Sequence, residues 1–169
     1  YPGDVFVFTP KGEVKEFPHG STPLDFAYAV HSDVGHRCVG AKINGKIVPL
    51  RYRLRSGDVV EILTSQAQHP SKDWLKLVKT SRAISKIRAF LKQVERTKAK
   101  QLGQEILERE FRRFKTNLDK ESKTPQMADA IRSLGYKSLE DILVGLGYGK
   151  ITAKEISRAV LPSDVLDKP

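Results

Sequence analysis

The apolar residues of this 169-residue chain change their spacing near residue 65, and this change limits the fold more than any other feature. Before it, they form short runs separated by turns that contain glycine, proline or asparagine, a pattern typical of β-strands. After the polar segment 65–70, they recur every three or four residues, as on one face of a helix. The sequence therefore predicts two domains of different class, residues 1–65 and residues 71–165.

Turn signals divide the first region into five strands and one helix. Asn44-Gly45 favours a type I′ hairpin, because both central positions of that turn need a positive φ. Thr22-Pro23-Leu24-Asp25 is typical of a helix start, with a cap, a proline at the first helical position and an acidic residue three positions after the cap. The predicted strands are 5–8, 14–17, 38–43, 47–48 and 59–63, with the helix after the second. This β-β-α-β-β-β order predicts a β-grasp, ubiquitin-like domain.

The spacing in the second region predicts helices and no strands, and most of these helices are short. One begins at Ser71 and carries Trp74, and a longer one begins at Thr80 or Ser81 with an apolar stripe through Ile87. Further helices are predicted over 101–115, 125–134, 139–145 and 153–161, with glycines between them and Pro162 ending the last. The whole chain is therefore predicted to be α+β, a β-grasp domain followed by an all-α domain.

Positive charge is concentrated in one segment. Lys and Arg outnumber Asp and Glu by 30 to 20, and residues 65–100 alone hold ten basic residues against two acidic ones, a net charge of +8. A localised basic patch favours a polyanionic partner, whereas the alternative is an ordinary solvated helix face.

The basic residues of this segment fall into rows if the helix includes residue 79. Rows of Lys and Arg neutralise successive phosphates and give affinity without reading sequence. The candidates for phosphate contacts are Lys79, Arg82, Lys86 and Arg88, with Lys92 and Arg96 continuing the row of Arg88.

No pattern of a catalytic or metal site occurs in the sequence. The four histidines form no HExxH pair, and no nucleophile elbow or phosphate-binding loop is present. The glycine-rich segment 145–149 follows a helix and is predicted to end it. The single cysteine, Cys38, cannot form an internal disulfide and is predicted to be a small buried side chain. We expect no catalytic residue, no metal and no cofactor. No membrane-spanning stretch or secretory leader is found, so a cytoplasmic protein without a membrane partner is expected.

The segment His31-Ser-Asp-Val-Gly-His-Arg37 is the most suggestive loop. Its imidazole, carboxylate and guanidinium groups can bind sugar hydroxyls and phosphates or stack on an unpaired base. Alternatively, His31 and Asp33 satisfy the last carbonyls of the preceding helix and a turn amide. Trp74 could stack on a base, but it is better explained as a core residue of its short helix.

Several of these motifs resemble a known family. The runs VFVFTPKG (5–12), GSTPLDFAY (20–28), HSDVGHRCVGAK (31–42) and GDVVEI (57–62) are similar to the TGS domain of the RelA/SpoT (Rel) stringent-response family. The runs DWL (73–75), KTSR (79–82) and LGY…LGYG (134–149) resemble the helical domain of the same family. General TGS patterns also occur in threonyl-tRNA synthetases and some GTPases, whereas the HSDVGHRC and DWL…KTSR runs are specific.

The resemblance implies a regulatory, non-catalytic fragment. Full-length members make or hydrolyse guanosine tetra- and pentaphosphate in separate N-terminal domains, and on the ribosome their TGS domain contacts the 3′ CCA end of deacylated tRNA. The histidine of that contact corresponds to His31; Arg37, Lys42 and Lys11 are weaker candidates. The implied partners are deacylated tRNA, ribosomal RNA and the catalytic domains of the parent chain. The alternatives are an acidic protein partner such as acyl carrier protein, or an autoinhibitory intramolecular role.

Overall fold

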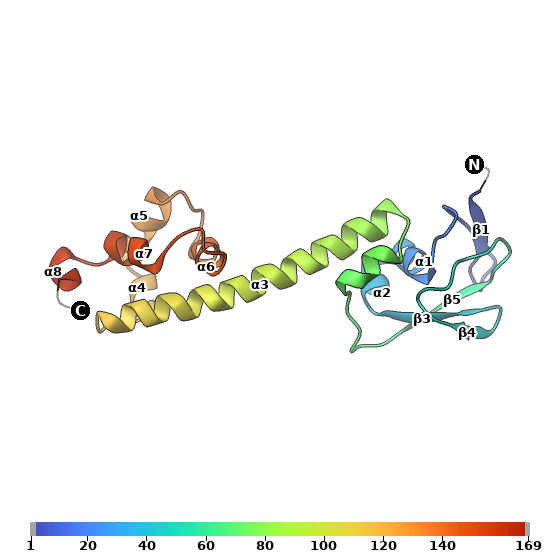
Figure 1. Cartoon of the computed structure of the whole chain (residues 1–169), viewed down its shortest axis with the longest axis horizontal. Helices are drawn as coiled ribbons and strands as arrows, with labels where there is room; N and C mark the ends of the chain where they lie inside the picture. Colours follow the sequence, from blue (N-terminus) through green and yellow to red (C-terminus); the bar gives the residue numbers. More distant parts are fainter. Residues whose placement is uncertain (1–2, 168–169) are drawn as a thin grey trace. The chain divides into compact units, whose positions relative to one another are not determined.

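A computed structural model describes residues 3–167 (Figure 1), and its contacts divide the chain into two compact units, one up to Lys92 and one from Gln93 onwards. Within residues 3–167, the strands belong to the first unit and the second unit holds only helices, while helix α3 (Ser81–Arg113) has residues in both units. The predicted α+β class is thereby confirmed.

The strands of unit 1 form two small sheets. The first pairs β1 with β2, and the second has the order β4-β3-β5, with every pairing antiparallel. One parallel bridge between Phe8 and Val59 joins the two sheets. The strands are β1 (Val5–Phe8), β2 (Val14–Phe17), β3 (Cys38–Ile43), β4 (Lys46–Val48) and β5 (Val60–Thr64). The hairpin between β3 and β4 is confirmed, since Asn44 and Gly45 have φ values of 51° and 84°.

Helix α1 (Pro23–Val30) begins as its sequence predicts, since the Asp25 carboxylate accepts the Thr22 N–H at 2.9 Å. The segment after α1 differs from the prediction, because Ser32–His36 forms a short helix, α2, instead of a loop. Gly35 lies inside α2. A Cβ on Gly35 would stand 2.2 Å from the Tyr28 ring, so the glycine allows α2 to fold back tightly on α1.

Unit 1 has core residues on both sides of α1. One side packs on the sheets through Phe26 and the other on the residues that follow the last strand. Those residues form the 3-10 helix η1 (Lys72–Lys76), whose Trp74 is buried as predicted, and the start of α3. The predicted limits 1–65 and 71–165 therefore do not coincide with the compact units, because residues 72–92 pack with the β-grasp domain.

Helix α3 (Ser81–Arg113) is one continuous helix of 33 residues. The sequence predicted a separate helix over 101–115, and this was wrong. No proline or capping residue interrupts the chain there, and Gly103 serves as a packing position instead of a break. A Cβ on Gly103 would stand 1.8 Å from the Leu143 carbonyl oxygen, so α3 and α6 touch backbone to backbone.

The remaining helices of unit 2 are short and capped. They are α4 (Leu118–Ser122), α5 (Pro125–Ser133), α6 (Leu139–Gly147), α7 (Ala153–Val160) and α8 (Ser163–Leu166). Thr124, Ser138 and Thr152 cap α5, α6 and α7 by accepting backbone N–H bonds three residues ahead. Pro162 ends α7 as predicted, since α7 stops at Val160. The short helices α4 and α8 were not predicted, and α8 begins directly after Pro162.

Candidate nucleic-acid interface

His31 joins α1 to α2 and belongs to the caps of both. Its backbone N–H donates to the Ala27 carbonyl at the end of α1, and its side-chain Nδ1 accepts the Asp33 N–H at 3.0 Å at the start of α2. A neutral imidazole that accepts at Nδ1 carries its proton on Nε2. The side chain of His31 is 66% exposed, so that Nε2–H is a donor at the surface. His31 thus takes part in the caps of both helices, as in the alternative explanation of the 31–37 segment. Its exposed ring edge can still bind a ligand.

A shallow apolar groove of about 410 Å³ lies next to this histidine. Val30 and Val34, which flank His31 in sequence, line it together with Ile62 of β5. Lys11, from the turn between β1 and β2, stands at its rim, as does Glu61. A groove of this kind offers a surface on which an unpaired base can stack, with a cation close by for phosphate.

The other two candidates for the acceptor end are placed differently. Lys42 lies on β3, and its Nζ atom is 4.0 Å from the Glu61 carboxylate on β5. Because Glu61 lines the groove, Lys42 lies close to the groove without lining it. Arg37 is exposed but follows the far end of α2, and its carbonyl accepts the Ser65 N–H. Of these candidates, the structure therefore places only Lys11 in the groove lining, with His31 next to the lining residue Val30, Lys42 near the lining residue Glu61, and Arg37 apart from them.

The cations of the basic segment occupy two sides of α3. Arg82 and Lys86 form one exposed row, Arg88 and Lys92 form another, and the buried stripe of Ala83 and Ile87 runs between them. Lys79 precedes the helix and does not share its face, because its backbone N–H is bound to Asp25. The two rows that the sequence predicted are therefore present, but Lys79 does not belong to the first of them.

Two residues of the +8 segment are already neutralised within unit 2. Arg96 donates to Asp141 at 2.7 Å, and Lys100 donates to Glu140 at 2.9 Å, both at the start of α6. The hydrogen bond from Arg96 is the main cause that lowers the pKa of Asp141. Arg96 therefore does not extend the row of Arg88, and these two cations have partners within the protein.

Asp25 has a structural role that its sequence did not reveal. Its carboxylate is 1% exposed and accepts the backbone N–H groups of Lys79 and Thr80 and the Thr80 hydroxyl, at 2.8–3.1 Å. Thr80 in turn caps α3 by accepting the Ala83 N–H. One acidic residue thus caps α1 locally and fixes the start of α3, 55 residues away in sequence.

Four ring side chains from different parts of the chain, those of Tyr28, His36, His69 and Phe90, lie together at the end of α2. His36 Nδ1 is 2.8 Å from the Tyr28 hydroxyl, and the His36 ring lies 5.0 Å from Phe90 of α3, centre to centre. His69 stacks on the same Phe90 at 6.5 Å. Burial lowers the pKa of His36, helped by Lys86 and opposed by Asp33, so the imidazole is neutral at pH 7. Sequence reasoning missed this group, because its members are distant in the chain and follow no motif.

Cys38 is buried next to this group, as predicted. Burial raises the pKa of its thiol to about 11, and burial is likewise the main cause that raises the pKa of Tyr28. A thiol of this kind is a poor nucleophile. Within residues 3–167 no three His, Cys, Asp or Glu side chains are grouped to hold a metal ion. No helix of that described range is long and apolar enough to cross a membrane.

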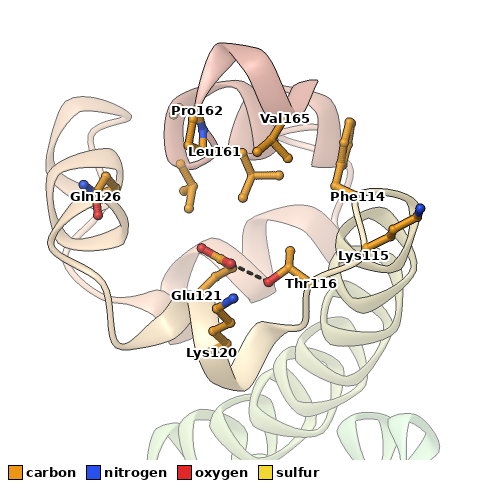
Figure 2. Close-up of a pocket in the computed structure, with 11 residues that line it drawn as sticks. Phe114, Lys115, Thr116, Lys120, Glu121, Gln126, Leu161, Pro162 and Val165 are labelled. Carbon is orange, nitrogen blue, oxygen red and sulfur yellow. Dashed lines mark hydrogen bonds between the residues drawn. The ribbon is translucent and has the colours of Figure 1, made fainter. Parts of the chain in front are cut away.

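Unit 2 carries its own groove, of about 590 Å³, between the end of α3 and α8 (Figure 2). Leu161, Pro162 and Val165 form an apolar side, and the buried Glu121 carboxylate accepts a hydrogen bond from the Thr116 hydroxyl on the opposite side. The glycine-rich segment 145–149 has two roles. Gly149, at φ 75°, follows the end of α6 as predicted, whereas Gly147 is a packing residue against Ala99.

Comparison with known families assigns both parts of the chain. A TGS domain model matches residues 5–64, and a RelA/SpoT AH domain model matches residues 90–161. The chain is thus a TGS domain followed by an AH domain, and together the two matches cover most of its length. It belongs to the RelA/SpoT family, which confirms the resemblance seen in its motifs.

Three relatives illustrate the match. The chain is 56% identical over 97% of its length to a GTP pyrophosphokinase of Myxococcus xanthus. It is 45% identical over 98% to a guanosine-3′,5′-bis(diphosphate) 3′-pyrophosphohydrolase of Aquifex aeolicus, and 42% identical over 94% to a bifunctional (p)ppGpp synthase/hydrolase RelA of Mycobacterium tuberculosis. The chain spans only 22–23% of the length of these relatives.

Proposed function

We propose that this chain is a non-catalytic regulatory module of a cytoplasmic RelA/SpoT-type enzyme. In this role it recognises the 3′ CCA end of deacylated tRNA on the ribosome and controls the synthetase and hydrolase domains of its parent. The observation that carries the proposal is the exposed imidazole of His31, held by the Asp33 N–H beside an apolar groove with Lys11 at its rim.

This geometry suits discrimination between two forms of one RNA end. A free terminal ribose offers hydroxyl oxygens that can accept the Nε2–H of His31, whereas an esterified ribose loses one of them and adds bulk. A site built to pair with a hydroxyl rejects a ligand that lacks it more strongly than a purely apolar site rejects a small change in size. Steric exclusion of the aminoacyl group adds to the same preference.

Affinity in this proposal comes from α3. Within the described residues, Arg82, Lys86, Arg88 and Lys92 are exposed and none of them forms an ion pair. Such cations release counterions when they meet phosphates, so they add binding energy without sequence preference. The groove at His31 then supplies the selection and the basic rows supply the attraction.

The test compares deacylated and aminoacylated tRNA in ribosome complexes, for the wild-type chain and for His31→Ala. We expect the wild type to prefer deacylated tRNA and His31→Ala to lose that preference. His19→Ala is the matched control, because His19 is also exposed but neither of its neighbours in sequence lines the groove, whereas Val30 beside His31 does. Equal affinity of the wild type for both tRNAs would refute the proposal.

The phosphate contacts are tested by the salt dependence of RNA binding. Arg82→Ala should lower the slope of log affinity against log salt by about one unit. Lys100→Ala removes the same charge from a cation that is already paired with Glu140, so its slope should stay close to the wild-type value. If the two variants behave alike, the exposed rows do not contact phosphate.

An acidic protein, such as acyl carrier protein, is a second candidate partner, since unpaired cations on α3 suit any polyanion. Competition separates the two: an acidic protein partner would be displaced by another acidic protein and not by tRNA. In the intramolecular alternative, deleting the module from the parent enzyme would raise its basal activity in the absence of RNA.

A further inference from the structure

The short helix α2 connects the surface histidine to helix α3. Its first turn carries the Asp33 N–H that holds His31, and its last residue, His36, contacts Phe90. Five residues of helix rise only about 7 Å, so the two ends of α2 move together. A displacement of His36 therefore also displaces the donor that orients His31.

Helix α2 packs closely on α1, and three of its contacts involve Tyr28. Gly35 lies directly on the Tyr28 ring, where a Cβ would have no room. The Tyr28 hydroxyl hydrogen-bonds His36 at 2.8 Å, and the His36 ring meets Tyr28 edge-on at 5.3 Å. These contacts hold α2 to α1. The His36 ring also meets the Phe90 ring of α3.

Phe90 is well placed to connect the two family domains. It packs within unit 1, and it is also the first residue that the AH domain model matches. His69, from the segment that follows the TGS match, stacks on the same ring. Lys86, one turn earlier on α3, lies close enough to influence the pKa of His36, and Asp33 opposes it from α2 itself.

We propose that His36 and Phe90 are positioning residues for His31, so that occupancy of the His31 site and packing of α3 on α2 are energetically coupled. This inference rests on the function proposed above, because it takes His31 as the ligand contact. Coupling is reciprocal: if the packed Phe90 favours the ligand-ready His31, then a ligand on His31 favours the packed Phe90 by the same factor. The start of the AH domain would thereby sense the RNA end without touching it.

Phe90→Ala tests the coupling, with Phe90→Tyr as the conservative variant that keeps the ring. Ile84→Ala is the matched control, because Ile84 is a half-buried residue of the same helix that packs against the core cluster and has no ring to meet that of His36. The ribosome-bound chain is measured for its preference for deacylated over aminoacylated tRNA. The free chain is measured by the NMR shift of the Asp33 amide, which reports the bond to His31.

Phe90→Ala should reduce the tRNA preference about fivefold or more and move the Asp33 amide toward its position in His31→Ala. Phe90→Tyr should restore both, and Ile84→Ala should lower the melting temperature without moving either. If the NMR shift of the Asp33 amide in Phe90→Ala equals that of the wild type, the inference is overturned, whatever the tRNA result. A wild-type chain without tRNA preference would instead refute the proposed function, while the amide shift would still decide the coupling.

Discussion

The buried carboxylate of Asp25 should be the most sensitive single position in unit 1. Asp25→Ala leaves three backbone N–H groups without their acceptor: that of Thr22, which is 3% exposed, and those of Lys79 and Thr80, which water reaches in part. A buried donor left unpaired costs about 1–3 kcal/mol, and a lost helix cap costs about 1 kcal/mol. Allowing for water at two of the three donors, we expect the free energy of unfolding to fall by about 3–5 kcal/mol.

Urea unfolding followed by the fluorescence of Trp74 measures this loss. Trp74 is the only tryptophan of the sequence, and it is buried in η1, directly before the residues that Asp25 binds. Asp73→Ala is the control, since the Asp73 side chain is 88% exposed and faces Lys76 at only 3.9 Å; its effect should stay within about 0.5 kcal/mol. A loss below about 1 kcal/mol in Asp25→Ala would refute the assignment of Asp25 as the anchor of α3.

Three further predictions concern single side chains. Gly147→Ala should destabilise unit 2 by about 2–3 kcal/mol in chemical denaturation, because the new Cβ would stand 1.8 Å from the Ala99 carbonyl oxygen; in an exposed helix the same change is stabilising, so a gain in stability would contradict the close contact. Cys38 should react with a thiol reagent at pH 8 about a hundredfold or more slowly in the native chain than in urea, because its pKa of about 11 keeps it protonated. Because the pKa of His36 is lowered in the folded state, the unfolded state takes up a proton first as the pH falls below about 6.5, and stability should decline until the folded pKa is passed. His36→Asn should lose that part of the decline in melting temperature between pH 7.5 and 5, and an unchanged pH profile would show that His36 is not held neutral.

Local signals were sufficient where the structure depends on local geometry. Asn44-Gly45 predicted its hairpin because positive φ at two adjacent positions leaves few other conformations. Thr124, Ser138 and Thr152 predicted helix starts because a cap depends only on residues within one turn. Gly103, in contrast, is required by the close approach of another helix, which no signal within its own turn indicates.

The candidate site was predictable in its residues but not in its geometry. The motif around His31 could be recognised, and its basic neighbours could be counted. The tautomer of His31, in contrast, depends on a helix of five residues at a place where the sequence predicts a loop. The pairing of Arg96 with Asp141 and of Lys100 with Glu140 depends on contacts across 40 residues or more, which no local pattern encodes.

The two anchors of α3 differ in kind, and this difference gives them different roles. Asp25 holds the Thr80 end through several charge-assisted hydrogen bonds, which are directional and costly to break. His36 meets Phe90, ten residues or about 15 Å further along the helix, through a ring contact that tolerates sliding. Between these two anchors, Ala83 and Ile87 of α3 are buried in the same core as Tyr28. Loss of the Asp25 anchor should therefore lower the stability of unit 1, whereas loss of the Phe90 ring should act mainly on the orientation of His31, as proposed above.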